Sequence, residues 1–261
     1  MKLNIVPART GFVWLKLGMR TFLKQPLALT GLFFMYMAGV LVLSQLPVVG
    51  SVLGAMLVPA ATLGLMAATA EAASGRFPMP SVLISAFRAG RQRARAMLVL
   101  GAIYTVGSML ATLLANVLVG DPAPAAAADS QNPALDPRSL VALLLHTPLV
   151  ILFWHSPALV HWHGVAPVKS LFFSAVACFR NFGAMLLYGL SWLGVFVLVA
   201  FTFSTVGMML GGIAVARSVM LPTVLLLVAM FSTSLYFTFR DSFDADDLPE
   251  AQPAPPGEST P

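Results

Sequence analysis

The sequence predicts an all-α membrane protein, a polytopic bundle of six transmembrane helices with amphipathic helices at the cytoplasmic interface. Of its 261 residues, 58% are hydrophobic and only 10% are charged, whereas soluble domains carry about 25% charged residues. The charges are also unevenly placed, because five long runs contain no Asp, Glu, Lys or Arg. These runs are 25–70, 96–120, 139–168, 181–216 and 218–239. A soluble helical protein would instead carry a polar stripe along each helix.

The lengths of these runs determine how many helices are expected. About 20 apolar residues cross a bilayer as a helix, so the first run holds two spans and each other run holds one. Membrane strands would be about 10 residues of alternating polarity, and these runs are continuously apolar. The expected spans are 27–46, 48–70, 97–119, 140–161, 183–205 and 218–238, with a turn at Pro47 and Gly50 between the first two.

The residues before the first span are too many and too mixed in polarity for the start of a cleaved signal peptide. We expect Arg9, Lys16, Arg20 and Lys24 to lie on an interfacial segment that leads into an uncleaved helix. Similar amphipathic segments start at Pro80 and Pro167 and carry Arg88 and Arg180 near their ends. This pattern favours three repeated units, although any six-span protein with short inner loops shows it equally well.

The placement of Lys and Arg predicts the orientation in the membrane. If the N-terminus lies inside, 13 of the 15 basic residues fall on inner segments, and Arg138 and Arg217 fall outside. This bias places both termini in the cytoplasm, with residues 1–239 as a six-helix membrane domain. Residues 240–261 contain six acids and one base and are expected to form a disordered acidic cytoplasmic tail. Residues 121–138 are expected to form an outer loop without a fold of its own.

Arg88, Arg91 and Arg95 form the most persuasive candidate site. Their spacings of three and four place them on one face of a helix, and Phe87 supplies apolar surface beside them. We expect this helix to contact anionic lipid headgroups. Lys169 and Arg180 are expected to form a second site of the same kind with fewer charges. Positive charge that serves only to orient the chain explains the cluster equally well. Nucleic-acid binding is disfavoured, because membrane orientation accounts for the basic excess.

Three of the four histidines lie within the stretch 153–164. A helix turns about 100° per residue, so His155 and His161 lie on different faces, as do His161 and His163. No Cys or carboxylate accompanies them to complete a metal shell, and we expect neither metal nor cofactor. His155 is the candidate for a functional polar residue inside the membrane. The alternative is a neutral imidazole that forms a hydrogen bond with a neighbouring helix.

A resemblance to a known family adds to this interpretation. Residues 157–160, residues 167–170 and the triplet Phe179-Arg180-Asn181 before an apolar span resemble a family of six-span proteobacterial inner-membrane proteins. They are also distantly similar to the membrane domains of some bacterial glycerophosphodiesterases. The resemblance covers most of the membrane region, but not the tail, and implies no activity or catalytic residues. The carboxylate and His constellation of a phosphodiesterase domain is missing.

Function is therefore predicted only in outline. The expected spans carry no acidic or basic residue, which argues against a proton-coupled transporter. We expect a non-enzymatic protein that organises the membrane or serves as an accessory subunit, with the bilayer and its anionic lipids as partners. The alternative is a passive transporter or lipid-handling permease, which needs no titrating carboxylate.

Overall fold

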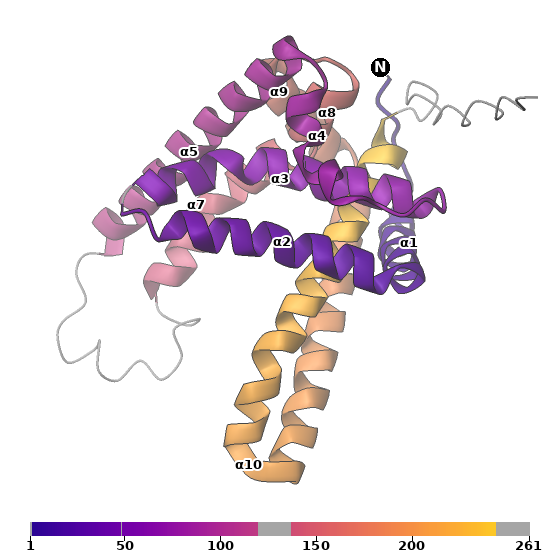
Figure 1. Ribbon diagram of the computed structural model, residues 1–261, viewed down its shortest axis with the longest axis vertical. Coiled ribbons are helices and arrows are strands. Elements are labelled where there is room, and N and C mark those ends of the chain that lie inside the picture. Colours follow the sequence, from indigo (N-terminus) through magenta and orange to yellow (C-terminus); the bar gives the residue numbers. More distant parts are fainter. Residues whose placement is uncertain (1, 48, 120–136, 244–261) are drawn as a thin grey trace, which may run out of the picture.

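The computed structural model describes residues 2–47, 49–119 and 137–243 (Figure 1). This part of the chain is helical, apart from an isolated antiparallel bridge between Leu3 and Phe243. The expected acidic tail beyond residue 243 and most of the expected outer loop lie outside the described residues. The elements are α1 (Thr10–Lys24), α2 (Pro26–Ser44), α3 (Val49–Ala73), η1 (Pro80–Ile84), α4 (Ser85–Arg88), α5 (Arg91–Val119), α7 (Pro137–Phe153), α8 (Ser156–Trp162), α9 (Pro167–Arg180) and α10 (Phe182–Ser242).

Five helical segments among the described residues are long and apolar enough to cross a membrane. They are Pro26–Ser44, Val49–Ala73, Arg91–Val119, Ser139–Trp162 and Phe182–Ser242. The predicted spans coincide with these segments to within a few residues at most ends. The largest difference is at α5, which begins six residues before the expected span and includes the arginines that precede it.

The helix α10 holds both of the last two expected spans. It is 61 residues long and reverses direction at Gly211 and Gly212, so that it forms a hairpin with two limbs (Figure 1). Gly212 has φ 73° and ψ −163°, a conformation that is essentially restricted to glycine. The limbs approach closely, because a Cβ on Gly207 would lie 2.6 Å from Cα of Ala216. The residues between the last two predicted spans, 206–217, were expected to form the connection between them. In the structure they are helical except at Gly211 and Gly212.

The apolar face of α1 packs on the base of this hairpin. Trp14 and Leu15 are buried with Tyr188 of the first limb and Phe237 of the second. Gly18 permits the contact, because a Cβ there would lie 2.5 Å from Cβ of Ser234. The amphipathic pattern expected for this segment is present, and its apolar face is covered by protein.

The helix α3 is the common neighbour of the other elements. Ala72 packs in a cluster with residues of α1, α2 and α10. Leu63 packs with residues of α4, α5 and the α7–α8 pair. Met66 packs with residues of α8, α9 and the end of α10. In Figure 1, α2, α3, α5 and α7 form one group, and the α10 hairpin extends away from it.

The segment before α1 is tied to both ends of α10 through Asn181. The Val6 N–H donates to Oδ1 of Asn181 at 2.9 Å, and Nδ2 of Asn181 donates to the Asn4 carbonyl at 3.0 Å. The Asn4 N–H donates to the Ser242 carbonyl at 2.9 Å. The start of the described chain and the end of α10 therefore lie side by side.

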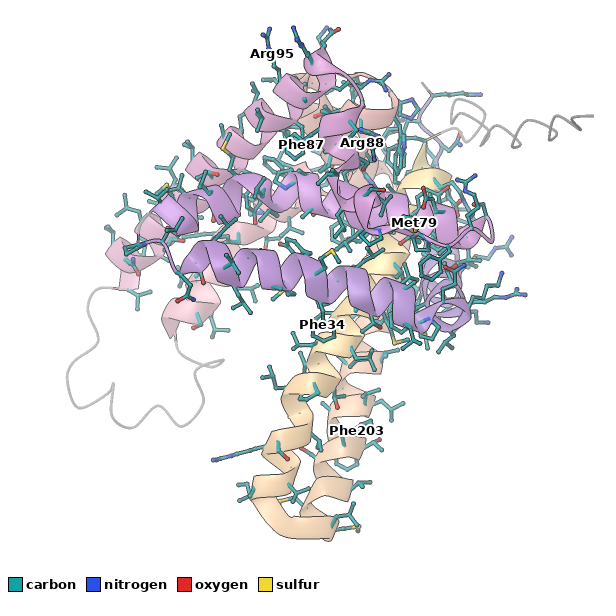
Figure 2. All side chains as sticks on the ribbon, viewed as in Figure 1. Phe34, Met79, Phe87, Arg88, Arg95 and Phe203 are labelled. Carbon is teal, nitrogen blue, oxygen red and sulfur yellow. The ribbon has the colours of Figure 1, made fainter. Side chains whose placement is uncertain are left out.

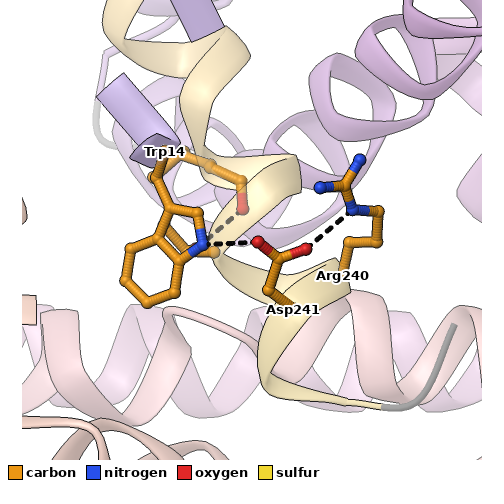
Figure 3. A network of polar contacts seen from close by, with 5 residues as sticks. Trp14, Arg240 and Asp241 are labelled. Atoms are coloured by element: carbon orange, nitrogen blue, oxygen red, sulfur yellow. Dashed lines mark hydrogen bonds and ion pairs between the residues drawn. The ribbon is translucent and has the colours of Figure 1, made fainter. Parts of the chain in front are cut away.

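A second polar contact holds the end of α10 to α1. The indole N–H of Trp14 donates to Oδ2 of Asp241 at 2.9 Å, and Oδ1 of Asp241 pairs with Nε of Arg240 at 2.8 Å (Figure 3). Phe243 is 1% exposed. Packed residues therefore continue to position 243, four residues beyond the predicted end of the membrane domain at residue 239.

Candidate functional site

The histidine stretch surrounds a break between α7 and α8. The helix is interrupted at Trp154 and His155. Pro157 lies in the first turn of α8, where proline is tolerated because that N–H has no helical partner. Ser174 of α9 lies beside the break. Its Oγ donates to the Ile151 carbonyl at 2.9 Å and accepts the His155 N–H at 3.0 Å.

His155 is 1% exposed, and its ring lies against two aromatic rings at the end of α10. The ring centroids are 6.1 Å from Phe239 and 5.6 Å from Phe243. Neither ring nitrogen has a hydrogen-bond partner among the described residues. The expectation that the imidazole bonds to a neighbouring helix is therefore wrong. The contact with α9 runs through the backbone N–H of His155, and the ring packs on α10.

The other two histidines of the stretch have different neighbours. The ring of His163 lies 5.8 Å from Phe239, so it packs on the same aromatic pair as His155. His161 instead lines a cavity together with Arg88. Within the described ranges, no three His, Cys, Asp or Glu side chains gather as a metal-ligand set. His155 and His163 therefore share aromatic neighbours, whereas His161 faces the cavity.

Arg88, Arg91 and Arg95 do not share one helical face, contrary to the prediction. Arg88 ends α4, and α5 begins at Arg91. Gly90 between them has a φ of 100°, which favours glycine and interrupts the helix. Figure 2 shows Arg95 at an extremity of the molecule, with Arg88 between it and Met79. All three side chains are exposed.

Lys169 and Arg180 lie near opposite ends of α9 and are both exposed. The buried face of this helix is lined by small side chains, including Ser174 and Cys178. Burial raises the pKa of the Cys178 thiol to about 12. The opposite face exposes Phe172 at 64% and other apolar residues. The exposed face therefore carries large apolar side chains beside Lys169 and Arg180, while Leu171 and Phe173 pack towards the core.

Two polar cavities were not predicted, and the first of them borders the candidate residue Arg88. The first, of about 550 Å³, lies where the end of α3, the η1–α4 segment and the end of α8 meet. Its lining includes Glu71, Arg76, Ser85, Arg88 and His161. One feature of the sequence could have indicated this cavity. Glu71, which lines it, is the one acidic residue before position 121.

The second cavity, of about 370 Å³, lies between α3 and α5 within the candidate spans. Its polar lining comes mainly from one face of α5, which carries Thr105, Ser108, Thr112 and Asn116. Oγ of Ser108 lies 3.3 Å from Nε2 of His146 on α7. The chain therefore places a row of polar side chains in an apolar region, in a hollow that opens to the surface at Thr112 and Asn116.

The outer surface of the helices is strongly apolar. Large side chains are exposed along both limbs of α10 and along α2, including Phe203 and Phe34 (Figure 2). Other examples are Leu27 at 89% and Met209 at 82% exposed. Soluble monomers rarely expose contiguous apolar surface of this extent, whereas lipid tails cover such a surface at no cost.

Comparison with known proteins agrees with a membrane location. A protein of Burkholderia thailandensis, described as a probable inner membrane protein, is 36% identical over 259 residues, covering 95% of this chain and 96% of the relative. No family model and no solved structure matches the chain, so the suggested similarity to glycerophosphodiesterase membrane domains has no support. This chain is an integral membrane protein and belongs to the same family as that probable inner membrane protein.

Proposed function

We propose that this protein is a non-enzymatic, six-span inner-membrane protein with cytoplasmic termini, whose basic surface contacts anionic lipids. It organises the surrounding membrane or serves as an accessory subunit. The observation that carries the proposal is the stretch 74–95, which consists of the connection after α3 and the first turn of α5 and has five arginines and no acidic residue.

Parity supports six crossings. Leu3 and Phe243 form a backbone bridge, so both lie on the same side of a bilayer. The chain between them must then cross an even number of times. The five candidate segments give six crossings when the two limbs of α10 each cross once.

The charges around the connecting segment support the lipid contact. Arg88, Arg91 and Arg95 are exposed, and none forms an ion pair with a described residue. A basic residue near an anionic membrane surface contributes about 1 kcal/mol of binding. Because no ion pair with a described residue neutralises these side chains, their charge is available to headgroups.

A matched pair of double variants tests the proposal. Arg91→Gln with Arg95→Gln removes two charges from the predicted inner surface. Arg138→Gln with Arg217→Gln removes two from the predicted outer surface. Protein extracted with its surrounding lipid is analysed for the ratio of phosphatidylglycerol to phosphatidylethanolamine. We expect the first variant to lose most of its anionic enrichment and the second to keep it. Equal ratios in the wild type and both variants would refute the lipid contact.

A passive permease is the second candidate, and the hydroxyl-lined cavity between α3 and α5 favours it. Such a path predicts flux of small polar solutes into proteoliposomes. We expect Ser108→Leu, which fills the cavity, to abolish that flux, while Thr202→Leu on the exposed surface of α10 leaves it unchanged. Flux no faster than in empty liposomes removes this candidate.

A further inference from the structure

The α3–α5 connection forms a wall with two different faces. Ser81, Ser85 and Arg88 of η1 and α4 line the 550 Å³ cavity on one side. Leu83, Ile84 and Phe87 of the same two elements line an apolar hollow of about 190 Å³ on the other side. The alternation along this short segment therefore separates a polar chamber from an apolar one. The two chambers lie next to each other.

The polar chamber holds two guanidinium groups beside apolar side chains such as Phe77 and Val82. The side chains of Arg76 and Arg88 both line it, and neither forms an ion pair with a described residue. A guanidinium group donates two parallel hydrogen bonds to a phosphate, which an ammonium group cannot do. The chamber is therefore suited to a phosphate.

Two further polar atoms in this chamber lack partners. Oγ of Ser85 and Nδ1 of His161 are buried, and no described residue forms a hydrogen bond with either. Buried polar atoms are nearly always satisfied, and each exception calls for an explanation. Both residues line the same cavity as the two arginines, so a rotation of each side chain would bring these atoms to one ligand with several oxygen atoms.

The apolar chamber is suited to a hydrocarbon chain. It is bounded by α2 and α3 as well as by the wall, through residues such as Val40, Leu43 and Leu57. Gly39 also lines it, and a Cβ on Gly39 would meet no atom within 4 Å. A ligand that fills both chambers needs a phosphate at one end and an apolar chain at the other.

We propose that the α3–α5 connection holds one phospholipid, with its phosphate on Arg76 and Arg88 and an acyl chain in the hollow between α2 and α3. This site rests on the lipid contact proposed above and gives it a specific location. Glu71 lies in the same lining, where its carboxylate accepts a hydrogen bond from a headgroup hydroxyl or ammonium group. The site thus holds one specifically bound lipid, which is distinct from the anionic lipids that surround the protein in general.

Native mass spectrometry of the detergent-purified full chain tests the site, with dioleoyl phosphatidylglycerol and inorganic phosphate as separate probes. We expect the wild type to retain one phospholipid. Arg76→Gln with Arg88→Gln should weaken its binding about tenfold or more, because hydrogen bonds to charged groups are among the strongest. Arg76→Lys with Arg88→Lys keeps both positive charges but removes the paired N–H donors of the guanidinium groups. Its binding of the phospholipid should therefore also be weaker than that of the wild type. Unchanged thermal unfolding shows that each variant is folded.

Two more variants identify the source of the phosphate and separate the two proposals. Gly39→Phe fills the apolar hollow and should expel phosphatidylglycerol while leaving any phosphate binding unchanged. Arg91→Gln with Arg95→Gln should keep the single lipid even as the general anionic enrichment falls. Unchanged retention in the Arg76 and Arg88 variants overturns the site but leaves the lipid-contact proposal standing. Inorganic phosphate that displaces the lipid, or a Gly39→Phe variant that keeps it, overturns the lipid assignment.

Discussion

Replacing Asn181 with alanine should release the N-terminal segment from the end of α10. Asn181 is 2% exposed. Its side chain accepts the Val6 N–H at 2.9 Å and donates to the Asn4 carbonyl at 3.0 Å. A third contact, to Oγ of Ser242, is longer at 3.5 Å. Alanine removes all three contacts but leaves the helix backbone unchanged.

The size of the effect follows from the two short hydrogen bonds. An unsatisfied buried partner costs about 1–3 kcal/mol. Val6 and Asn4 are only half-buried, so water replaces part of the loss and the lower end of that range applies to each. We therefore expect about 2 kcal/mol in total, which increases the equilibrium constant for local opening about 30-fold.

Hydrogen exchange measured by mass spectrometry reports this opening directly. The amides of Asn4 and Val6 should exchange about 30-fold faster in Asn181→Ala, while those of α3 keep their protection. Asn116→Ala is the matched control, because Asn116 is exposed and surface substitutions usually change stability by less than about 0.5 kcal/mol. If residues 2–9 keep wild-type exchange rates in Asn181→Ala, the role assigned to Asn181 is incorrect.

Three further predictions concern helix packing, the hairpin turn and the buried thiol. Gly18→Ala should destabilise the protein by about 1–3 kcal/mol in thermal unfolding, because its Cβ would meet Ser234 at 2.5 Å and overpacking has that cost. Gly31→Ala, which meets nothing within 4 Å, should not. Gly212→Ala should cost about 1–3 kcal/mol through backbone strain, whereas Gly194→Ala on the same helix, with open space around it, should be neutral or stabilising. Cys178 should resist alkylation at pH 8 until the protein is unfolded, because burial raises its pKa to about 12 and the thiolate is the reactive form. Its labelling rate should rise with pH towards that value, and rapid labelling of folded protein at pH 8 would contradict this. The pKa of the Cys178 thiol is higher in the folded protein than in the unfolded chain. Any stability that the neutral thiol contributes is therefore fully present below about pH 9 and is lost as the pH rises towards 12.

Composition and the charge-free runs predicted the class of protein and the positions of the helices. The class and the helix positions are readable from the sequence because the lipid interior excludes charged side chains along the whole length of a span. The turn of α10 was placed only broadly, because residues 206–217 are nearly as apolar as the limbs. In the structure the chain reverses within two residues, Gly211 and Gly212. This pair of glycines was the feature of the sequence that could have located the turn.

The candidate site was less predictable, because its geometry depends on contacts between distant residues. The break at Trp154 and His155 is accompanied by hydrogen bonds to Ser174, a residue of another helix. Helical spacing placed Arg88 on the face of Arg91, but Gly90 ends that helix first. The cavity brings His161 to Glu71 and Arg76, which are far apart in sequence, and no local pattern encodes that approach.

The break between α7 and α8 also has a consequence for how the protein is made. Ser174, which donates to the Ile151 carbonyl, lies 23 residues further along the chain. α9 follows residues 139–162 along the chain, so it can pack against them only after they have begun to enter the bilayer. Backbone groups left unpaired in lipid cost several kcal/mol each, so the Ile151 carbonyl and the His155 N–H need another partner until Ser174 arrives. The final hydrogen bonding at this break therefore depends on the docking of α9.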